Sequence, residues 1–256
     1  MDLLQAFVLG VVEGVTEFLP ISSTGHLIVF GKLLGLAQSD AQNGFDIIIQ
    51  LGAIFAVIAN YREKFTPRYF RLWCKIALAF IPIGAVGFAF ALQIEALFSV
   101  TVVATMFIIG GVIFLVLEHF YTPGQAHHIT DIEKVSWKQA FLIGCAQVCA
   151  LLPGTSRSGA TIVGGLLVSL DRKTAAEFSF LLAMPVMLAT TAYAVLTHHS
   201  ELDGSNLTTL AVGFFTAFVV AFLSVRWLIH FLAHYTFRAF GVYRIVLGIV
   251  LLIWFR

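Results

Sequence analysis

The sequence contains very little charge for its size. Only 11% of its 256 residues are Asp, Glu, Lys or Arg, whereas soluble globular domains carry about 25%. Hydrophobic residues make up 59% of the chain, and 25 of the residues are phenylalanine. No water-soluble fold can bury that much apolar surface, so a soluble enzyme or binding module is excluded. The formal net charge of +1 excludes nucleic-acid binding through a basic surface.

Cysteine is also scarce, with only Cys74, Cys145 and Cys149 in the chain. Their spacing is neither that of a disulfide framework nor that of a metal site. Residues 1–4 lack the basic segment that is typical of a cleavable signal. We therefore expect the hydrophobic spans themselves to direct the chain to a membrane.

Long apolar stretches are what the sequence has in abundance. A helix that spans a bilayer needs about 20 mainly apolar residues. Six uninterrupted stretches of suitable length occupy residues 43–61, 68–92, 98–120, 174–197, 207–231 and 238–255. Two further segments, 2–36 and 137–170, are interrupted in the middle, and their halves are short enough for the arms of a re-entrant hairpin. The sequence thus predicts an all-α integral membrane protein with six transmembrane helices and two re-entrant helical hairpins.

The two interrupted segments resemble each other. Gln5–Gly10 (QAFVLG) matches Gln139–Gly144 (QAFLIG), and the likeness continues through Pro20 and Pro153 with a one-residue slip, and through Ser23 and Ser156. The alternative, two unrelated Gly/Pro kinks, does not explain a likeness that extends beyond the breaks. Paired interruptions of this kind usually mark the binding site of a repeat.

Each half of the chain therefore consists of one hairpin followed by three spans. We expect a single membrane domain, residues 1–256, with repeat 1 at about 1–120 and repeat 2 at about 137–256. Because three spans are an odd number, the second repeat starts from the opposite face of the membrane. This is an inverted-topology repeat, and it would bring the tips of the two hairpins together near the middle of the bilayer.

Lysine and arginine in short loops predict the orientation. Residues 62–75 contain a basic cluster, and the other loops predicted on the same side add Lys134, Lys138, Arg172, Lys173 and Arg238. The opposite loops, at about 93–98 and 198–206, contain no Lys or Arg. We therefore expect residues 62–71 to be cytoplasmic and both termini to be outside.

Two acidic residues lie in the first interrupted segment. Glu13 and Glu17 are four residues apart, and hence on one face of a helix. An acidic side chain inside a membrane helix costs about 2.5–3.5 kcal/mol on the insertion scale, so two on one face indicate a function. They could hold a cation, act as a base or pair with Arg157. A salt bridge that only joins the two halves is the structural alternative.

A polar cluster, residues 22–26 (SSTGH), follows the break at Pro20. Ser and Thr are favoured N-caps, so the second arm is expected to start here with free backbone N–H groups, which form a natural phosphate site. His26 lies one turn further on and could transfer a proton or attack phosphorus. A histidine with only structural contacts is the alternative, but its place beside a capping cluster favours a function.

Arg157 is the only Lys or Arg between Gln139 and Leu170. Its planar guanidinium matches the geometry of phosphate oxygens, and a charge this deep in an apolar segment indicates a function. Neighbouring groups that could complete an anion cradle are Gly154, Ser156, Ser158 and Thr161. A kinked helix with its hydroxyls bonded to the backbone would explain the serines and threonine but not Arg157. Together, the two segments fit phosphoryl transfer on a lipid.

These motifs resemble the bacterial undecaprenyl-diphosphatase family of the bacitracin-resistance type. Residues 13–20 (EGVTEFLP) with 22–26 resemble its first signature, and residues 153–161 (PGTSRSGAT) its second, with Thr155 where many members carry an aromatic residue. The likeness covers essentially the whole chain. It implies hydrolysis of undecaprenyl pyrophosphate to undecaprenyl phosphate and inorganic phosphate, which recycles the lipid carrier for peptidoglycan synthesis.

The resemblance also implies location and partners. It implies a multi-pass protein of the cytoplasmic (inner) membrane, with a site open toward the outer, periplasmic face. It implies a divalent cation, Mg²⁺ or Ca²⁺, which we assign to Glu13 and Glu17, and bacitracin resistance, because bacitracin competes for the lipid. Family roles transfer to Glu13, Glu17, Ser22, Ser23, His26, Ser156, Arg157 and Thr161, and Gln50 resembles a family position near the site. Neither a monomer nor a homodimer is fixed by the sequence.

The expected mechanism leaves the nucleophile open. Arg157 and the hydroxyls of the second hairpin hold the pyrophosphate, and Glu17 orients or deprotonates the attacking group. Either His26 is the nucleophile or general acid–base, or Ser23 is the nucleophile. Two other functions are alternatives. The phosphatidic-acid-phosphatase superfamily places a catalytic His where this chain has Val163, and a transporter of the polyprenyl phosphate carrier would share the inverted-repeat architecture.

Overall fold

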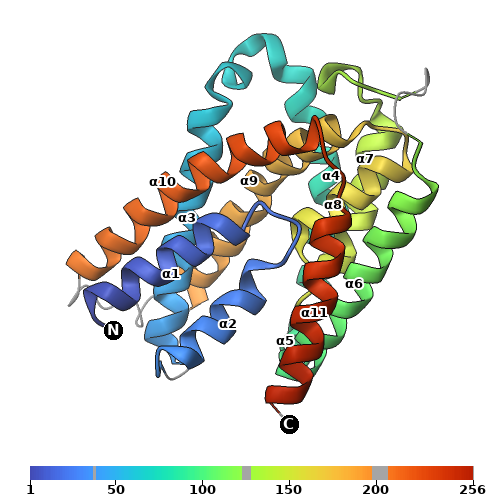
Figure 1. The fold of residues 1–256 in the computed structure, drawn as a ribbon. Coiled ribbons are helices and arrows are strands. Elements are labelled where there is room, and N and C mark those ends of the chain that lie inside the picture. Colours follow the sequence, from blue (N-terminus) through green and yellow to red (C-terminus); the bar gives the residue numbers. More distant parts are fainter. Residues whose placement is uncertain (37–38, 123–127, 198–206, 256) are drawn as a thin grey trace.

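Every regular element in the described part of the chain is a helix. The computed structural model describes residues 1–36, 39–122, 128–197 and 207–255 (Figure 1). The helices are α1 (Leu3–Thr16), α2 (Ser23–Leu33), α3 (Asp40–Asn60), α4 (Phe70–Ala89), α5 (Ala91–Glu95), α6 (Val100–Phe120), α7 (Trp137–Gln147), α8 (Arg157–Leu167), α9 (Arg172–Thr197), α10 (Leu207–Leu232) and α11 (Arg238–Trp254). Short 3-10 helices are η1 (Arg62–Phe65), η2 (Pro67–Tyr69), η3 (Ile132–Lys134) and η4 (Val148–Leu151).

Among the described residues, five helices are long and apolar enough to cross a membrane. By length and composition these are α3, α4 together with η2, α6, α9 and α10, with mean hydropathy between 1.5 and 2.7. The prediction of an all-helical, multi-pass membrane protein is confirmed at this level. The sixth predicted span, residues 238–255, forms α11, which has only 17 residues. It also contains a buried charge, Arg244, which is not among the predicted site residues.

The two interrupted segments form two helical hairpins, α1–α2 and α7–α8, with matching ends. Each first helix begins with a capping box, in which Asp2 pairs with Gln5 and Ser136 with Gln139. Each of these glutamines also closes its hairpin, because its Nε2 donates to a carbonyl at the end of the second helix. The distances are 3.1 Å from Gln5 to Leu34 and 2.7 Å from Gln139 to Val168. The donor and the acceptor of the second bond each lie 134 residues after their counterparts in the first hairpin (139 − 5 = 134; 168 − 34 = 134).

The turns of the two hairpins match at the same offset. Ser22 precedes α2 and Ser156 precedes α8, and both have positive φ values, 69° and 74°. A non-glycine residue in that region costs about 1–3 kcal/mol, and such strain collects at functional sites. The equivalent of Ser156 is therefore Ser22 rather than Ser23, and the one-residue slip expected from the sequence is confined to the prolines. Both second helices start where the sequence predicts, although the Ser22 side chain makes no capping hydrogen bond, whereas Ser156 caps Gly159.

The first arm of each hairpin packs closely on one long helix of the other half. Helix α1 lies along α10, α7 along α4, and α6 along α11, as Figure 1 shows for α1 with α10 and α6 with α11. Glycine makes the first contact close, since a Cβ at Gly10 would lie 2.7 Å from the Gly213 oxygen and one at Gly14 would lie 2.7 Å from the Val220 Cβ. This packing brings both hairpin turns to the middle of the molecule.

Candidate active site

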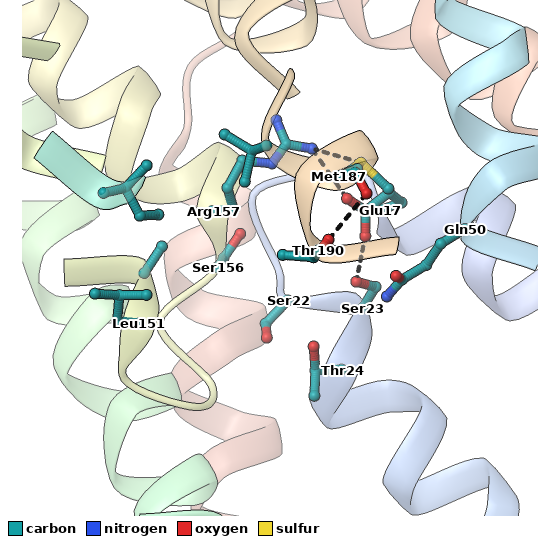
Figure 2. A pocket seen from close by; sticks show the side chains of 13 residues that line it. Glu17, Ser22, Ser23, Thr24, Gln50, Leu151, Ser156, Arg157, Met187 and Thr190 are labelled. Carbon is teal, nitrogen blue, oxygen red and sulfur yellow. Dashed lines mark hydrogen bonds and ion pairs between the residues drawn. The ribbon is translucent and has the colours of Figure 1, made fainter. Parts of the chain in front are cut away.

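The turns of the two hairpins meet beside a cavity that is lined by both polar and apolar residues. The Ser158 hydroxyl donates to the Leu19 carbonyl at 2.9 Å, which joins the start of α8 directly to the turn before α2. Beside this contact lies a cavity of about 200 Å³ (Figure 2). Its lining residues are Glu17, Ser22, Ser23, Thr24, Gln50, Ile83, Ala150, Leu151, Ser156, Arg157, Val186, Met187 and Thr190. Six of the predicted site residues are therefore brought together around one cavity.

Glu17 is the centre of the polar contacts in this cavity. Its Oε1 pairs with Arg157 Nη2 at 3.0 Å, and its Oε2 accepts a hydrogen bond from Ser23 Oγ at 2.5 Å. The Glu17 and Arg157 side chains are only 8% and 12% exposed. An ion pair removed from water in this way must be well bonded to offset its desolvation. The first hairpin thus contributes a hydroxyl and a carboxylate, and the second contributes the cation, as Figure 2 shows.

Arg157 is fixed from three sides. Besides Glu17, its Nη1 donates to the Ser179 carbonyl on α9 at 3.0 Å. Its guanidinium carbon lies 5.8 Å from the centre of the Phe18 ring. Its Nε has no hydrogen-bond partner among the described residues. The guanidinium therefore has a fixed direction, and not all of its five N–H groups are used by the protein.

The other predicted members of the anion cradle divide into two groups. Ser156 lines the cavity, and its Oγ accepts from Gly159 N and lies 3.1 Å from Ser158 Oγ. Ser158 and Thr161 lie outside the lining and bond to the protein itself, Thr161 with Ser179 Oγ at 2.6 Å. Gly154 is in the turn, at φ 91°, and is also outside the lining. Gly154 thus belongs to the second turn and Ser158 and Thr161 to the start of α8, and none of the three lines the cavity.

His26 lies behind the turn and does not line this cavity. Its Nδ1 is 2.7 Å from the Ser22 carbonyl oxygen and its Nε2 is 2.7 Å from the Tyr243 hydroxyl. A carbonyl can only accept, so Nδ1 donates to it and Nε2 accepts from the tyrosine. The Tyr243 ring stacks on the imidazole at 5.7 Å. His26 instead borders a second, mainly apolar cavity of about 490 Å³ between α1, α2 and α11.

Glu13 is fully buried next to the site, and neither of its carboxylate oxygens has a hydrogen-bond partner in the described part of the chain. Gln147, at the equivalent position of the second hairpin (147 − 13 = 134), is likewise buried without a partner for its amide. Across residues 1–36, 39–122, 128–197 and 207–255, no three His, Cys, Asp or Glu side chains gather as a metal site.

Several cavity residues are absent from the sequence prediction. Thr24 lies inside the SSTGH cluster and could have been included on that ground. Met187 and Thr190 come from α9, and only the packing of α9 on the hairpins brings them to the cavity. Gln50, which the resemblance indicated, does line it, and its amide points toward Ser23 in Figure 2.

Comparison with known proteins identifies relatives over the full length. The chain is 53% identical to the undecaprenyl-diphosphatase of Sulfurovum sp. over 98% of its own length and 99% of that protein. It is 52% identical to the undecaprenyl-diphosphatase of Sulfurimonas denitrificans over all of both chains. It is 51% identical to that of Methanococcus aeolicus, over 100% and 99% of the two chains. The family model of bacitracin resistance protein BacA matches residues 6–250, and the chain therefore belongs to that family.

Proposed function

We propose that this chain hydrolyses undecaprenyl pyrophosphate to undecaprenyl phosphate and inorganic phosphate in the cavity between the two hairpin turns. Relatives that are 51–53% identical over nearly their whole length are named for that activity. The observation that carries the proposal is the contact series Ser23–Glu17–Arg157, which joins a hydroxyl, a base and an anion-binding cation across the two hairpins. An apolar protein that crosses the membrane several times suits a lipid substrate.

The geometry supports Ser23 as the nucleophile. Its Oγ attacks the terminal phosphorus while its proton passes to Glu17 Oε2, 2.5 Å away. The anhydride P–O bond breaks, undecaprenyl phosphate leaves, and a phosphoserine remains. The departing undecaprenyl phosphate takes the proton from Glu17, which becomes a carboxylate again. Water then attacks the phosphorus of the phosphoserine, Glu17 takes a proton from the water, and the P–O bond to Ser23 breaks as Glu17 returns that proton to Oγ, which releases inorganic phosphate. The alternative with His26 has less support, because both ring nitrogens are already engaged away from the cavity.

Two groups would stabilise the phosphate charge. Arg157 presents a fixed guanidinium, and one such donor is worth about 10²–10³ in rate when it faces developing charge. The N-terminus of α2 is the second group. The Ser22 side chain does not cap this helix, so the first backbone N–H groups of α2 are available for phosphate. Ser156 and Gln50 line the same cavity and can orient the phosphate oxygens.

Glu13 and Glu17 fit a divalent cation that binds together with the substrate. The unpartnered carboxylate of Glu13 lies one helical turn before Glu17. Mg²⁺ is often held by one or two carboxylates plus substrate phosphates, so two protein ligands are sufficient. Mg²⁺ or Ca²⁺ bound there would neutralise phosphate charge. A chelator is expected to lower turnover, and added Mg²⁺ or Ca²⁺ to restore it.

The membrane arrangement that we propose is the inverted repeat of residues 1–120 and 137–256, with six spans and two re-entrant hairpins. Its support is the matching bonds of the two hairpins at an offset of 134 and the equivalent packing of α1 on α10 and α7 on α4. Helix α11, with 17 residues, is at the lower end of the length range of membrane spans, about 17–25. We further propose the cytoplasmic membrane as its location, with the site open to the outer face.

The test of this function is phosphate release from undecaprenyl pyrophosphate by the purified protein in detergent. Release that depends on the protein and on a divalent cation would support the hydrolase. Wild-type protein that binds the lipid but releases no phosphate with any cation would contradict it and favour the transporter alternative, in which the hairpins act as gates.

A further inference from the structure

Arg244 is a buried charge that the proposed chemistry does not use. It lies in α11, and its side chain has no exposed surface. It forms no ion pair with a carboxylate in the described part of the chain, and its four hydrogen bonds go to main-chain carbonyl oxygens. A charge in an apolar helix is costly, and one without a counter-ion usually has a specific task.

Two of these bonds join the turns of the two hairpins. Nη1 donates to the Pro20 carbonyl at 3.1 Å, and Nη2 donates to the Gly154 carbonyl at 3.0 Å. These two carbonyls occupy equivalent positions, 134 residues apart (154 − 20 = 134), and each stands two residues before the strained serine of its turn. One guanidinium therefore links the same point of both turns.

The other two bonds attach Arg244 to α6. Nη2 also donates to the Met106 carbonyl at 3.0 Å, and Nε donates to the Phe107 carbonyl at 3.4 Å. Gly110 makes room for the guanidinium, because a Cβ there would collide with it. Arg244 is thus held by the packed helices α6 and α11, and its guanidinium also bonds to both turns.

We propose that Arg244 is a positioning residue of the reaction, which keeps the Ser23–Glu17 hairpin in register with the Arg157 hairpin. It does not line the cavity, so it acts through the turns and not on the substrate. The inference rests on the proposed function, because register matters only if the two hairpins share one reaction. Lysine cannot replace it, because an ammonium lacks the planar fork that reaches two carbonyls on different segments.

The test is the split between kcat and KM for phosphate release by Arg244→Lys in the whole protein. We expect kcat to fall by about 10²-fold, the size of effect that a misplacement of about 1 Å produces. KM should change less than about threefold, because the cavity lining is intact. Arg172→Lys is the control, since Arg172 makes a buried pair with Glu118 at 2.5 Å outside the site and its loss should affect stability rather than kcat.

Gly110→Ala provides a second variant in case Arg244→Lys does not fold. It retains the charge but displaces the guanidinium, so it should reduce kcat in the same direction. Gly31→Ala is its control, because no atom lies within 4 Å of a Cβ at Gly31. Wild-type protein without phosphate release would overturn the proposed function together with this inference. If the wild type is active, and either folded Arg244→Lys or Gly110→Ala has a kcat within threefold of the wild-type value, the inference about Arg244 is overturned while the proposed function stands.

Discussion

At the scale of single residues, Glu17 couples the group that binds an anion to the group that attacks it. One of its oxygens contacts Arg157 and the other contacts Ser23, and the three residues come from two hairpins that are far apart in sequence. Removing the charge of Glu17 while keeping its shape should therefore affect both partners. The hydroxyl would lose its base, and the guanidinium would lose its ion pair.

We predict that Glu17→Gln lowers kcat by about 10²–10⁴-fold, which is the usual contribution of a general base. The measurement is steady-state phosphate release at saturating lipid. Glu63→Gln, on the exposed 3-10 helix η1, is a matched control that should leave kcat unchanged. A rate for Glu17→Gln within about threefold of wild type would remove Glu17 from the mechanism.

Sequence patterns identified the charged residues of the cavity for a physical reason. Glu17 and Arg157 are expensive inside apolar segments, so their presence alone indicates a task. Arg244 obeys the same rule within residues 238–255, and applying the rule to every span would have found it. Thr190 and Met187 carry no such signal, because they are ordinary residues of α9 that reach the cavity only through tertiary packing.

At the scale of elements, the hairpins depend on close contact with long helices of the other half. Gly14 of α1 faces the backbone of α10, where an added Cβ would lie 2.8 Å from the Ala217 oxygen and 2.7 Å from the Val220 Cβ. Such a contact cannot be relieved by the movement of one flexible side chain. The position of the first turn, and with it Ser23, therefore depends on a glycine in α1.

We predict that Gly14→Ala destabilises the protein by about 1–3 kcal/mol, the usual cost of overpacking a tight core. Gly31→Ala in α2 is the matched substitution at an open position, and it should leave stability unchanged or raise it. Thermal unfolding in detergent measures both. Equal melting temperatures for the two variants would show that α1 does not need the close approach to α10.

For the two hairpins, the start of each second helix could be predicted from the sequence, but the direction of the His26 side chain could not. The starts of α2 and α8 could be predicted from the break-and-serine pattern, since proline and serine act locally. The direction of His26 could not, because besides the local Ser22 carbonyl its ring contacts Tyr243 and Phe107, which are more than 80 residues away in sequence. A motif residue next to the site in sequence therefore does not line the cavity.

At the scale of the whole molecule, the basic segments lie together at one end. The Lys75 ammonium donates to the Glu133 carbonyl at 2.9 Å, which joins the region of residues 62–75 to η3. Figure 1 shows both termini at the opposite side from the segment of η1 and η2. This separation is what the positive-inside rule requires for a cytoplasmic end that contains residues 62–71.

We predict that a cysteine replacing Thr66 is labelled by a membrane-impermeant thiol reagent only after cells are permeabilised. A cysteine replacing Ser99, the N-cap of α6, should be labelled in intact cells. Both residues are exposed, and Cys74, Cys145 and Cys149 must first be replaced because two of them are exposed. Labelling of the Thr66 variant, and not the Ser99 variant, in intact cells would reverse the proposed orientation.

The most direct test of the account is phosphate release by wild type, Ser23→Ala and Arg157→Met. The three proteins are compared at the same occupancy by the lipid, after their melting temperatures have been shown to be equal. If the two hairpins share one catalytic centre, Ser23→Ala should lose at least about 10³-fold in kcat, as expected for a nucleophile, and Arg157→Met about 10²–10³-fold. Wild type quenched during turnover should also carry phosphate on Ser23. Folded variants that keep wild-type rates would contradict the claim that the meeting point of the two hairpins is the catalytic site.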